Sequence, residues 1–452
     1  MVQNKIKQFI LLLGDLVVFY GSLYLTLFVR YGQLPSKQLW QQHFLPFTAV
    51  FVVWIIIFYI SELYNLNFAI NNRKFYRLSF RSFFSGGLIA ALFFYLNPHI
   101  DITPKTNLAI FVVIFAIFFL LWRNFYNWSL KSYLPKEHLA IVGYNELVGE
   151  LVADLKNKPH LGYQIDFLVS EQQVDQAGLP VYSNLENLKK YLGQKKISTV
   201  VLASDPIRSE KLNTILFECL SLKLNFINLS HFYENMTGKV PIDIINKSWF
   251  LENLTEGNKS FYDISKRIFD ILLSIILLPF LFILAPFIAI IIKLDSKGPV
   301  FFKQLRLGKM GKRINVVKFR TMHYNANSTK PTDENDERIT NFGRFLRKTR
   351  LDELPQIVNV LKGEMSFVGP RPERPELVKE LEKVVPFYKE RMLVKPGITG
   401  WDQISNEYHS PSYKDTMKKL QYDLFYIKNR ALSLDISIIL KTLTTMLARS
   451  GR

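Results

Sequence analysis

The chain has 452 residues, of which 49% are hydrophobic, and it contains 37 Phe and 21 Tyr. This length allows two or three domains, and this aromatic content is typical of a chain in contact with lipid. Both observations disfavour a single soluble domain. The net charge of +19 favours anionic partners, and a single cysteine, Cys219, excludes an internal disulfide and indicates a reducing compartment.

Four apolar segments open the chain, each near the roughly 20 residues needed to cross a bilayer. The first is followed by no small-residue cleavage site, which predicts a retained helix rather than a signal peptide. Basic residues cluster after the second and fourth segments, so the positive-inside rule predicts a four-helix transmembrane bundle over residues 1–130 with both ends in the cytoplasm. Core helices of a soluble protein are the alternative, but such segments are hard to bury in water. The segments are Phe9–Val29, Phe44–Ile60, Phe83–Leu96 and Leu108–Trp122.

From His138 onward, short apolar runs alternate with helical stretches, which predicts a small parallel α/β domain over residues 137–235. The turn after its first strand, Gly143–Gly149, lacks two of the glycines that a dinucleotide fingerprint needs for close approach to pyrophosphate. We therefore expect a degenerate Rossmann-like domain with a structural or regulatory role. A domain that holds a nucleotide is the alternative.

A linker over residues 236–264 is predicted to lead to a fifth apolar run, Ile268–Ile292. Basic residues flank this run on both sides, which conflicts with a membrane crossing. Pro279 and Pro286 each remove a backbone donor, so a kinked, re-entrant helix that enters and leaves by the cytoplasmic face satisfies both charge and backbone. An ordinary fifth span kinked at proline is the alternative.

The remaining segment, within residues 265–452, carries the residues suited to catalysis. Between Lys293 and Arg350 fifteen basic residues accompany five acidic ones, which indicates a site for polyanions beside a membrane. Nucleic acid is disfavoured as the polyanion because the aromatic residues are not interleaved with the charge in a stacking pattern. The acidic residues of the polar loop Asn325–Glu337 are interpreted as solvated rather than as a metal site.

One acidic pair, Asp352 and Glu353, follows Arg350 in this basic setting. Nearby cations lower the pKa of a carboxylate, so we expect the pair to be anionic at neutral pH. An aspartate so placed can attack phosphorus when cations neutralise the phosphoryl oxygens. Adjacent residues on a helix point about 100° apart, which favours a nucleophile and a helper. A solvated pair that only binds its arginines is the alternative.

Three segments around this pair closely resemble the signatures of the bacterial sugar transferases, the monotopic phosphoglycosyl transferases that initiate surface polysaccharides. They are Lys318–Met322, Arg350–Pro372 and Lys395–Trp401. The resemblance runs from about Lys266 to the C-terminus. The four helices followed by an α/β domain are similar to the larger branch of this family, the undecaprenyl-phosphate glucose or galactose phosphotransferases.

The resemblance implies a reaction and a set of roles. Asp352 would attack the β-phosphorus of a UDP-sugar, expel UMP and hold the sugar phosphate until polyprenyl phosphate takes it. Glu353 would be its catalytic partner, and Mg²⁺ near Asp352 and Glu353 would bridge diphosphate oxygens. The resemblance also implies a location at the cytoplasmic face of a bacterial inner membrane, in contact with membrane lipids. It is compatible with a homodimer. The implied phosphate-binding residues are Lys318, Arg320, Arg347 and Arg371.

Two positions depart from the pattern of this family. The Ser-Pro pair that breaks the re-entrant helix of many members is replaced by Ile283, which lies between two prolines. The segment Gln403–Tyr408 replaces a Gln-Val-Asn-Gly-Arg-like stretch that is expected to touch the nucleotide sugar. The identity of the sugar is therefore not predicted.

Two other functions and one local ambiguity stay open on the sequence. A membrane nucleotide-sugar dehydratase or epimerase shares the layout of helices and Rossmann-like domain but needs an intact glycine fingerprint. A non-enzymatic scaffold for polysaccharide assembly would not need Asp352. The amphipathic stretch Leu432–Leu447 fits a helix on the membrane interface and also a helix packed on the catalytic core.

Overall fold

The computed structural model describes residues 2–66, 71–97, 104–132, 136–158, 161–170, 179–203, 210–254, 259–324, 336–405 and 412–447. The chain divides into two compact units, Met1–Phe232 and Tyr233–Arg452. Most of the polar loop Asn325–Glu337, and residues 406–408 of the departing segment, lie outside the described residues. The predictions for those stretches remain predictions.

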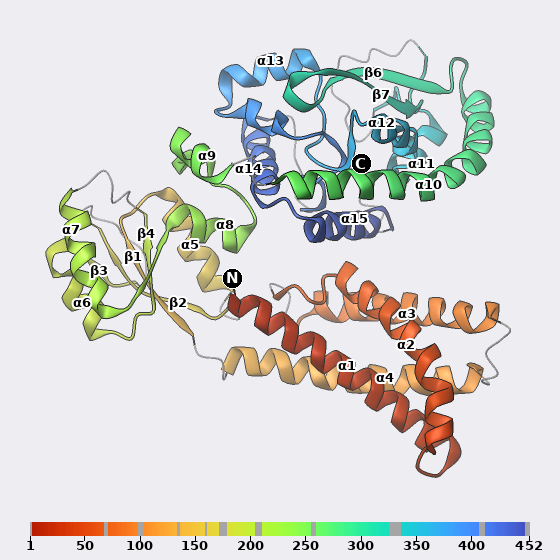
Figure 1. Cartoon of the computed structure of the whole chain (residues 1–452), viewed down its shortest axis with the longest axis horizontal. Coiled ribbons are helices and arrows are strands. Elements are labelled where there is room, and N and C mark those ends of the chain that lie inside the picture. Colours follow the sequence, from red (N-terminus) through yellow and green to blue (C-terminus); the bar gives the residue numbers. More distant parts are fainter. Residues whose placement is uncertain are drawn as a thin grey trace. The chain divides into compact units, whose positions relative to one another are not determined.

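Four long helices begin the first unit (Figure 1), and one hydrophobic core contains side chains from all of them. Aromatic rings stack within this core, where the ring of Phe19 lies 4.7 Å from that of Phe51 and 4.4 Å from that of Phe115. Each helix contains a stretch long and apolar enough to cross a membrane. The helices are α1 (Val2–Tyr31), α2 (Lys37–Ile60), α3 (Arg73–Leu96) and α4 (Pro104–Ser132).

The third helix is longer than the apolar segment Phe83–Leu96 that predicts it. It starts at Arg73 because the side chain of Asn72 accepts a hydrogen bond from the backbone N–H of Phe75 at 2.8 Å, which caps the first turn. The basic residues between the second and third apolar segments therefore lie on the first turns of α3 rather than in a loop.

A buried ion pair crosses the core of these helices. The guanidinium of Arg123 on α4 donates to Asp15 on α1 at 2.6 Å and to the carbonyl of Leu63 at 2.6 Å. Both charged side chains are buried. Pairing is the condition under which charges are tolerated away from water, so loss of either side chain would leave the other charge buried and unpaired between α1 and α4.

The α/β domain of the first unit contains a five-stranded sheet in the order β3-β2-β1-β4-β5. All pairings are parallel, which confirms the predicted sheet type. Cys219 is buried in its core. The strands are β1 (Glu137–Val142), β2 (Tyr163–Val169), β3 (Val181–Tyr182), β4 (Thr199–Leu202) and β5 (Asn225–Asn228), and the helices are α5 (Glu146–Asn157), α6 (Leu188–Gln194), α7 (Glu210–Glu218) and α8 (Leu229–Thr237).

The described residues of the segment 236–264, predicted as a linker, belong to the folded second unit. The segment contains α9 (Lys247–Asn253) and the beginning of the next helix. Val240, Ile242 and Trp249 are buried in the same core as residues of the segment that follows the fifth apolar run, residues 296–447, which is called the catalytic segment below. The segment is short of periodic apolar positions, so its packing is visible only in three dimensions.

The fifth apolar run forms α10 (Ser260–Asp295), a helix of 36 residues that extends beyond Ile268–Ile292 at both ends. It contains Pro279 and Pro286, and its ribbon bends part-way along in Figure 1. Most of its large apolar side chains are exposed, and it is the fifth described helix apolar enough to cross a membrane.

Both ends of α10 are bound to the catalytic segment of the same unit. Near its beginning, Arg267 donates to the carbonyls of Val360 and Leu361 at 2.6 and 2.7 Å. At its end, the carboxylate of Asp295 accepts a hydrogen bond from the backbone N–H of Phe342 at 3.0 Å.

The catalytic segment combines helices with two small sheets, an antiparallel β6–β7 pair and a parallel β8–β9 pair. Its core is continuous with that of the segment before α10. The strands are β6 (Phe301–Leu307), β7 (Arg313–Phe319), β8 (Ser366–Val368) and β9 (Gly397–Thr399), and the helices are α11 (Asn341–Thr349), α12 (Ile357–Lys362), α13 (Pro375–Val384), α14 (Tyr413–Asn429) and α15 (Leu432–Leu447).

The amphipathic C-terminal stretch forms α15, which packs on the catalytic core. Ile438 is buried in that core. Asp435 is also buried, and its carboxylate accepts hydrogen bonds at 2.8 Å from Tyr262, Lys266 and Tyr426. Of the two interpretations of this stretch, packing on the core is the one that these contacts support.

Candidate active site

The acidic pair lies on a 3₁₀ turn, Leu351–Gln356, directly after α11. Arg350 adopts a left-handed conformation with φ of 55°, which ends α11 and starts this turn. Successive residues of a 3₁₀ turn point about 120° apart, so Asp352 and Glu353 are directed differently, as the helix interpretation also predicts. Both side chains are buried, at 8% and 6% exposure, so the alternative of a solvated pair is wrong.

Glu353 is held by two of the predicted cations. Its Oε1 accepts hydrogen bonds from Lys318 Nζ at 2.6 Å and from Arg371 Nη2 at 2.9 Å. Burial acts to raise the pKa of Glu353, but Arg371 and Lys318 outweigh it and hold that pKa well below its usual value. The attraction of Glu353 in turn raises the pKa of Arg371, so both groups of this pair are charged.

Asp352 behaves differently from its neighbour. Burial, followed by repulsion from Glu353, raises the pKa of Asp352 to about 6, although Lys318 and Arg371 oppose the change. The cations do lower this pKa, as the sequence predicts, but desolvation is the larger effect, so the expected net decrease is wrong for Asp352. In the part of the chain that the structure describes, no hydrogen bond holds its carboxylate, which leaves an oxygen available to a substrate.

The other two predicted phosphate-binding residues have different surroundings. Arg347 donates from Nε to the hydroxyl of Thr321 at 2.9 Å and is near enough to lower the pKa of Asp352. Arg320 donates to the carbonyls of Ile292, Ser296 and Lys297 at 3.3, 2.6 and 2.9 Å, which secures the end of α10.

The structure does not bring Arg320 to the acidic pair. Its backbone N–H still donates to the carbonyl of Val300 at 2.9 Å, directly beyond the last pair of β6 and β7, but its side chain lies at the end of α10. Among the described residues its guanidinium is bonded to backbone carbonyls instead, so its predicted contact with phosphate has no support here.

The beginning of the departing segment lies beside the acidic pair. The side chain of Arg350 donates to Gln403 Oε1 at 3.0 Å, and Arg350 immediately precedes the turn that carries Asp352. This contact joins the residue before the pair to the segment that is expected to touch the nucleotide sugar.

Comparison with known proteins places this site in a family. Residues 261–449 match the model described as bacterial sugar transferase, and residues 58–228 match the model described as CoA-binding domain. The chain is 31% identical over 352 residues to the UDP-glucose:undecaprenyl-phosphate glucose-1-phosphate transferase of Xanthomonas campestris pv. campestris, covering 73% of this chain and 70% of the relative. The chain belongs to the bacterial sugar transferase family.

Two further relatives carry related names. The chain is 32% identical to the UDP-glucose:undecaprenyl-phosphate glucose-1-phosphate transferase of Escherichia coli (strain K12), covering 70% of this chain and 69% of the relative. It is 37% identical to the UDP-N-acetylgalactosamine-undecaprenyl-phosphate N-acetylgalactosaminephosphotransferase of Aeromonas hydrophila, covering 58% of this chain and 62% of the relative. The resemblance seen in the sequence motifs is confirmed, and this sugar transferase is an enzyme of the transferase class.

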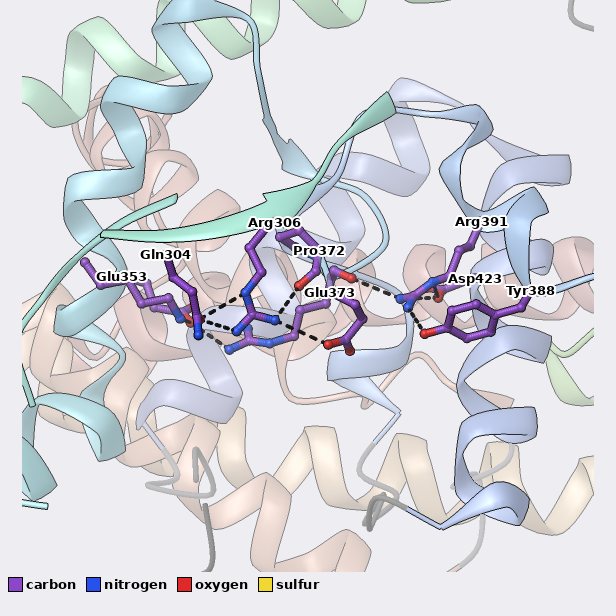
Figure 2. A network of polar contacts seen from close by, with 10 residues as sticks. Gln304, Arg306, Glu353, Pro372, Glu373, Tyr388, Arg391 and Asp423 are labelled. Atoms are coloured by element: carbon purple, nitrogen blue, oxygen red, sulfur yellow. Dashed lines mark hydrogen bonds and ion pairs between the residues drawn. The ribbon is translucent and has the colours of Figure 1, made fainter. Parts of the chain in front are cut away.

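Two arginines of this sugar transferase that the sequence patterns do not single out lie next to the site. Arg306 on β6 donates to the carbonyl of Pro372 at 3.1 Å, and Arg391 donates to the carbonyl of Arg371 at 3.0 Å. Figure 2 shows them in one polar network that begins at Glu353 and continues to Asp423. An arginine whose partners are backbone carbonyls has no signature in the sequence. The only signal available for Arg391 is its position four residues before the motif Lys395–Trp401.

Two adjacent carboxylates are a sufficient protein contribution to a magnesium site. No group of three or more His, Cys, Asp or Glu side chains that could hold a metal occurs in the described residues. Mg²⁺ is usually bound by one or two carboxylates, substrate phosphates and water, unlike metals that need a full set of protein ligands. Asp352 and Glu353 therefore match Mg²⁺ in ligand type and number, and the ion itself stays a prediction.

Proposed function

We propose that this sugar transferase moves a sugar 1-phosphate from a UDP-sugar to polyprenyl phosphate, with Asp352 as the nucleophile. The observation that carries the proposal is the contrast within the buried acidic pair: Glu353 is held by Lys318 and Arg371, whereas no hydrogen bond among the described residues holds the carboxylate of Asp352. The names of the relatives, which pair UDP-sugars with undecaprenyl phosphate, support the choice of substrates.

The proposed reaction has two displacements at one phosphorus atom. A carboxylate oxygen of Asp352 attacks the β-phosphorus of the UDP-sugar, and the bond to the bridging oxygen breaks, so UMP leaves with that electron pair. An oxygen of polyprenyl phosphate then attacks the same phosphorus and releases the Asp352 carboxylate. The product is a polyprenyl diphosphosugar, and the kinetics are expected to be ping-pong.

The surrounding charges suit this sequence of steps. With a pKa of about 6, Asp352 is mostly ionised at pH 7, the form that can attack. Lys318 and Arg371 are bonded to the neighbouring Glu353. Donors fixed in this way would stabilise negative charge on the diphosphate oxygens. When bound, Mg²⁺ would be held by Asp352 and Glu353 and would neutralise diphosphate charge.

The contacts of α10 support a re-entrant helix rather than a fifth span. Its first turns and its last residue are both bonded to the catalytic segment, and a folded segment of this kind occupies one side of a membrane. A bend at Pro279 or Pro286 is compatible with entry and exit at one face. We infer that helices α1 to α4 cross the inner membrane and that the second unit, which contains the catalytic segment and is called the catalytic unit below, works at its cytoplasmic face, as the basic residues around the helices predict.

The topology can be tested with single cysteines in a Cys219→Ser background. We expect Ser260→Cys and Lys297→Cys, one at each end of α10, to react equally with a membrane-impermeant maleimide in inverted inner-membrane vesicles and not in intact spheroplasts. Both positions are exposed, whereas the native Cys219 is buried. A spanning helix would instead give one labelled position in each preparation.

The proposed function is tested by UMP release from a panel of UDP-sugars with extracted protein, Mg²⁺ and polyprenyl phosphate. We expect one or a few sugars to give UMP, and chelation by EDTA to lower that rate by about 10²-fold until Mg²⁺ is restored, because the cation neutralises charge in the transition state. Absence of UMP with every sugar would favour the scaffold, and an EDTA-resistant rate would remove Mg²⁺ from the proposal.

A further inference from the structure

The backbone that carries Arg371 is bonded at four consecutive carbonyls. Pro370 O accepts from Gly397 N at 3.0 Å, and Glu373 O accepts from Leu307 N at 3.0 Å. Between them, the carbonyls of Arg371 and Pro372 accept from guanidinium groups rather than from backbone N–H groups. Because Pro370 and Pro372 also have fixed φ angles, this segment has little freedom left.

Arg391, which holds the carbonyl of Arg371, is itself anchored on the side away from the acidic pair. Its guanidinium is bonded to the carboxylate of Asp423 at 2.8 and 3.0 Å, and it donates to the hydroxyl of Tyr388 at 2.7 Å. The side chains of Arg391 and Asp423 are buried, at 6% and 3% exposure. Figure 2 shows this group at one end of the network.

Arg306, which holds the carbonyl of Pro372, is anchored from β6. Gln304 accepts from its Nε and Nη2 at 3.1 and 2.6 Å, and Glu373 forms an ion pair with it at 3.3 Å. Gln304 and Arg306 lie on the same face of β6, two residues apart. A second rigid element therefore fixes the other side of the same peptide segment.

We propose that Arg391 and Arg306 are positioning residues, which fix the Arg371 backbone so that its guanidinium is already directed at Glu353 and at the diphosphate before substrate binds. This inference rests on the proposed function. Arg371 itself is the exposed member of the network, with 42% of its side chain accessible, so its own packing does not hold it. Preorganised donors stabilise a transition state without rearrangement during the reaction, which is what a fixed backbone provides.

The choice of arginine at these positions fits that role. A guanidinium has several donors in a fixed plane, so Arg391 can bond to Asp423, Tyr388 and the carbonyl of Arg371 at the same time. A lysine would keep the charge beside Asp423 but would lack this fixed arrangement. Arg391→Lys therefore separates positioning from the simple need to neutralise a buried carboxylate.

The test is a double-mutant cycle of Arg391→Lys with Arg371→Ala, measured by the turnover number and KM for the UDP-sugar that gives UMP. If Arg391 acts through Arg371, Arg391→Lys lowers the turnover number by about 10-fold to 100-fold in the otherwise native protein, and by less than about threefold once Arg371 is Ala. Arg306→Lys is expected to behave in the same way, with a smaller loss because Arg306 is less enclosed. Arg313→Lys, at an exposed position on β7, is the matched control and keeps the native rate.

A second cycle uses the Kd for UDP, measured by calorimetry, with the same variants and the melting temperature of each. This binding measurement tests the positioning role even if no UDP-sugar gives UMP. Absence of UMP would refute the proposed function but not the positioning role of Arg391. Equal losses with and without Arg371, in rate or in Kd, would assign Arg391 a purely structural role and overturn the inference. An unchanged rate and Kd for Arg391→Lys would overturn it as well.

Discussion

Replacement of Asp352 by Asn is expected to lower UMP release by roughly 10⁴-fold or more, the scale of loss seen when a covalent nucleophile is removed. The amide has nearly the same shape and can occupy the same buried position, but it has no negative oxygen with which to attack phosphorus. Glu353→Gln is the matched variant on the same turn. It loses the charge that holds Lys318 and Arg371, so we expect a smaller loss, about 10²-fold.

The covalent intermediate gives an independent measurement of the same prediction. With a UDP-sugar and no polyprenyl phosphate, the intact mass of the native protein is expected to rise by that of one sugar phosphate less one water, because an acyl phosphate bond forms as UMP leaves. Asp352→Asn should show no such increase. Glu380→Gln, at an exposed position on α13, controls for the loss of an acidic charge and should match the native protein in rate and mass. Equal UMP release by Asp352→Asn and native protein would exclude an aspartyl intermediate.

Hydropathy predicts much of this fold, because long apolar helices and short buried strands each have a distinctive period. The five apolar segments correspond to α1 to α4 and α10, and the alternating runs after His138 correspond to a parallel sheet. The ends of these elements are less visible. The cap at Asn72 allows α3 to begin within a basic stretch. The segment predicted as a linker belongs to a hydrophobic core because Trp249 packs there against residues that are distant in the sequence.

Some residues of the candidate site can be identified from the sequence motifs, whereas their contacts and pKa values depend on the three-dimensional structure. The motifs identify Lys318 and Arg371, and the structure brings both to Glu353. The motifs also suggest Arg320, but the structure bonds that side chain to the carbonyls at the end of α10. The pKa of Asp352 could not be predicted from neighbouring charges alone, because burial, the largest contribution, is a property of the fold.

The glycines of two motifs have a backbone role that a sequence pattern alone does not explain. A Cβ on Gly397 would lie 2.2 Å from the backbone N of Gly369, and a Cβ on Gly369 would lie 2.4 Å from the carbonyl oxygen of Lys395. The two segments pair as parallel strands, with Gly369 N bonded to Thr399 O at 2.9 Å. Only glycine allows this approach, which brings the segment of Arg371 against β9.

Gly397→Ala is therefore expected to destabilise the catalytic unit by at least about 3 kcal/mol, the upper end of the usual cost of overpacking, because the obstructing atoms are backbone and cannot rotate away. Gly397 also donates to Pro370 O, so the same change disturbs the first of the four bonded carbonyls beside Arg371. The measurement is the temperature at which detergent-solubilised protein loses UMP release and aggregates. We expect this temperature to fall by several degrees or the variant to accumulate only as aggregate.

Gly193→Ala is the matched control for this change. Gly193 lies on α6, where an added Cβ meets nothing within 4 Å, and alanine favours a helix over glycine by about 1 kcal/mol. The control should therefore keep or slightly improve stability. If Gly397→Ala unfolds at the native temperature, the β8–β9 pair has room for a Cβ, and the close approach of the two strands is not what fixes the segment of Arg371.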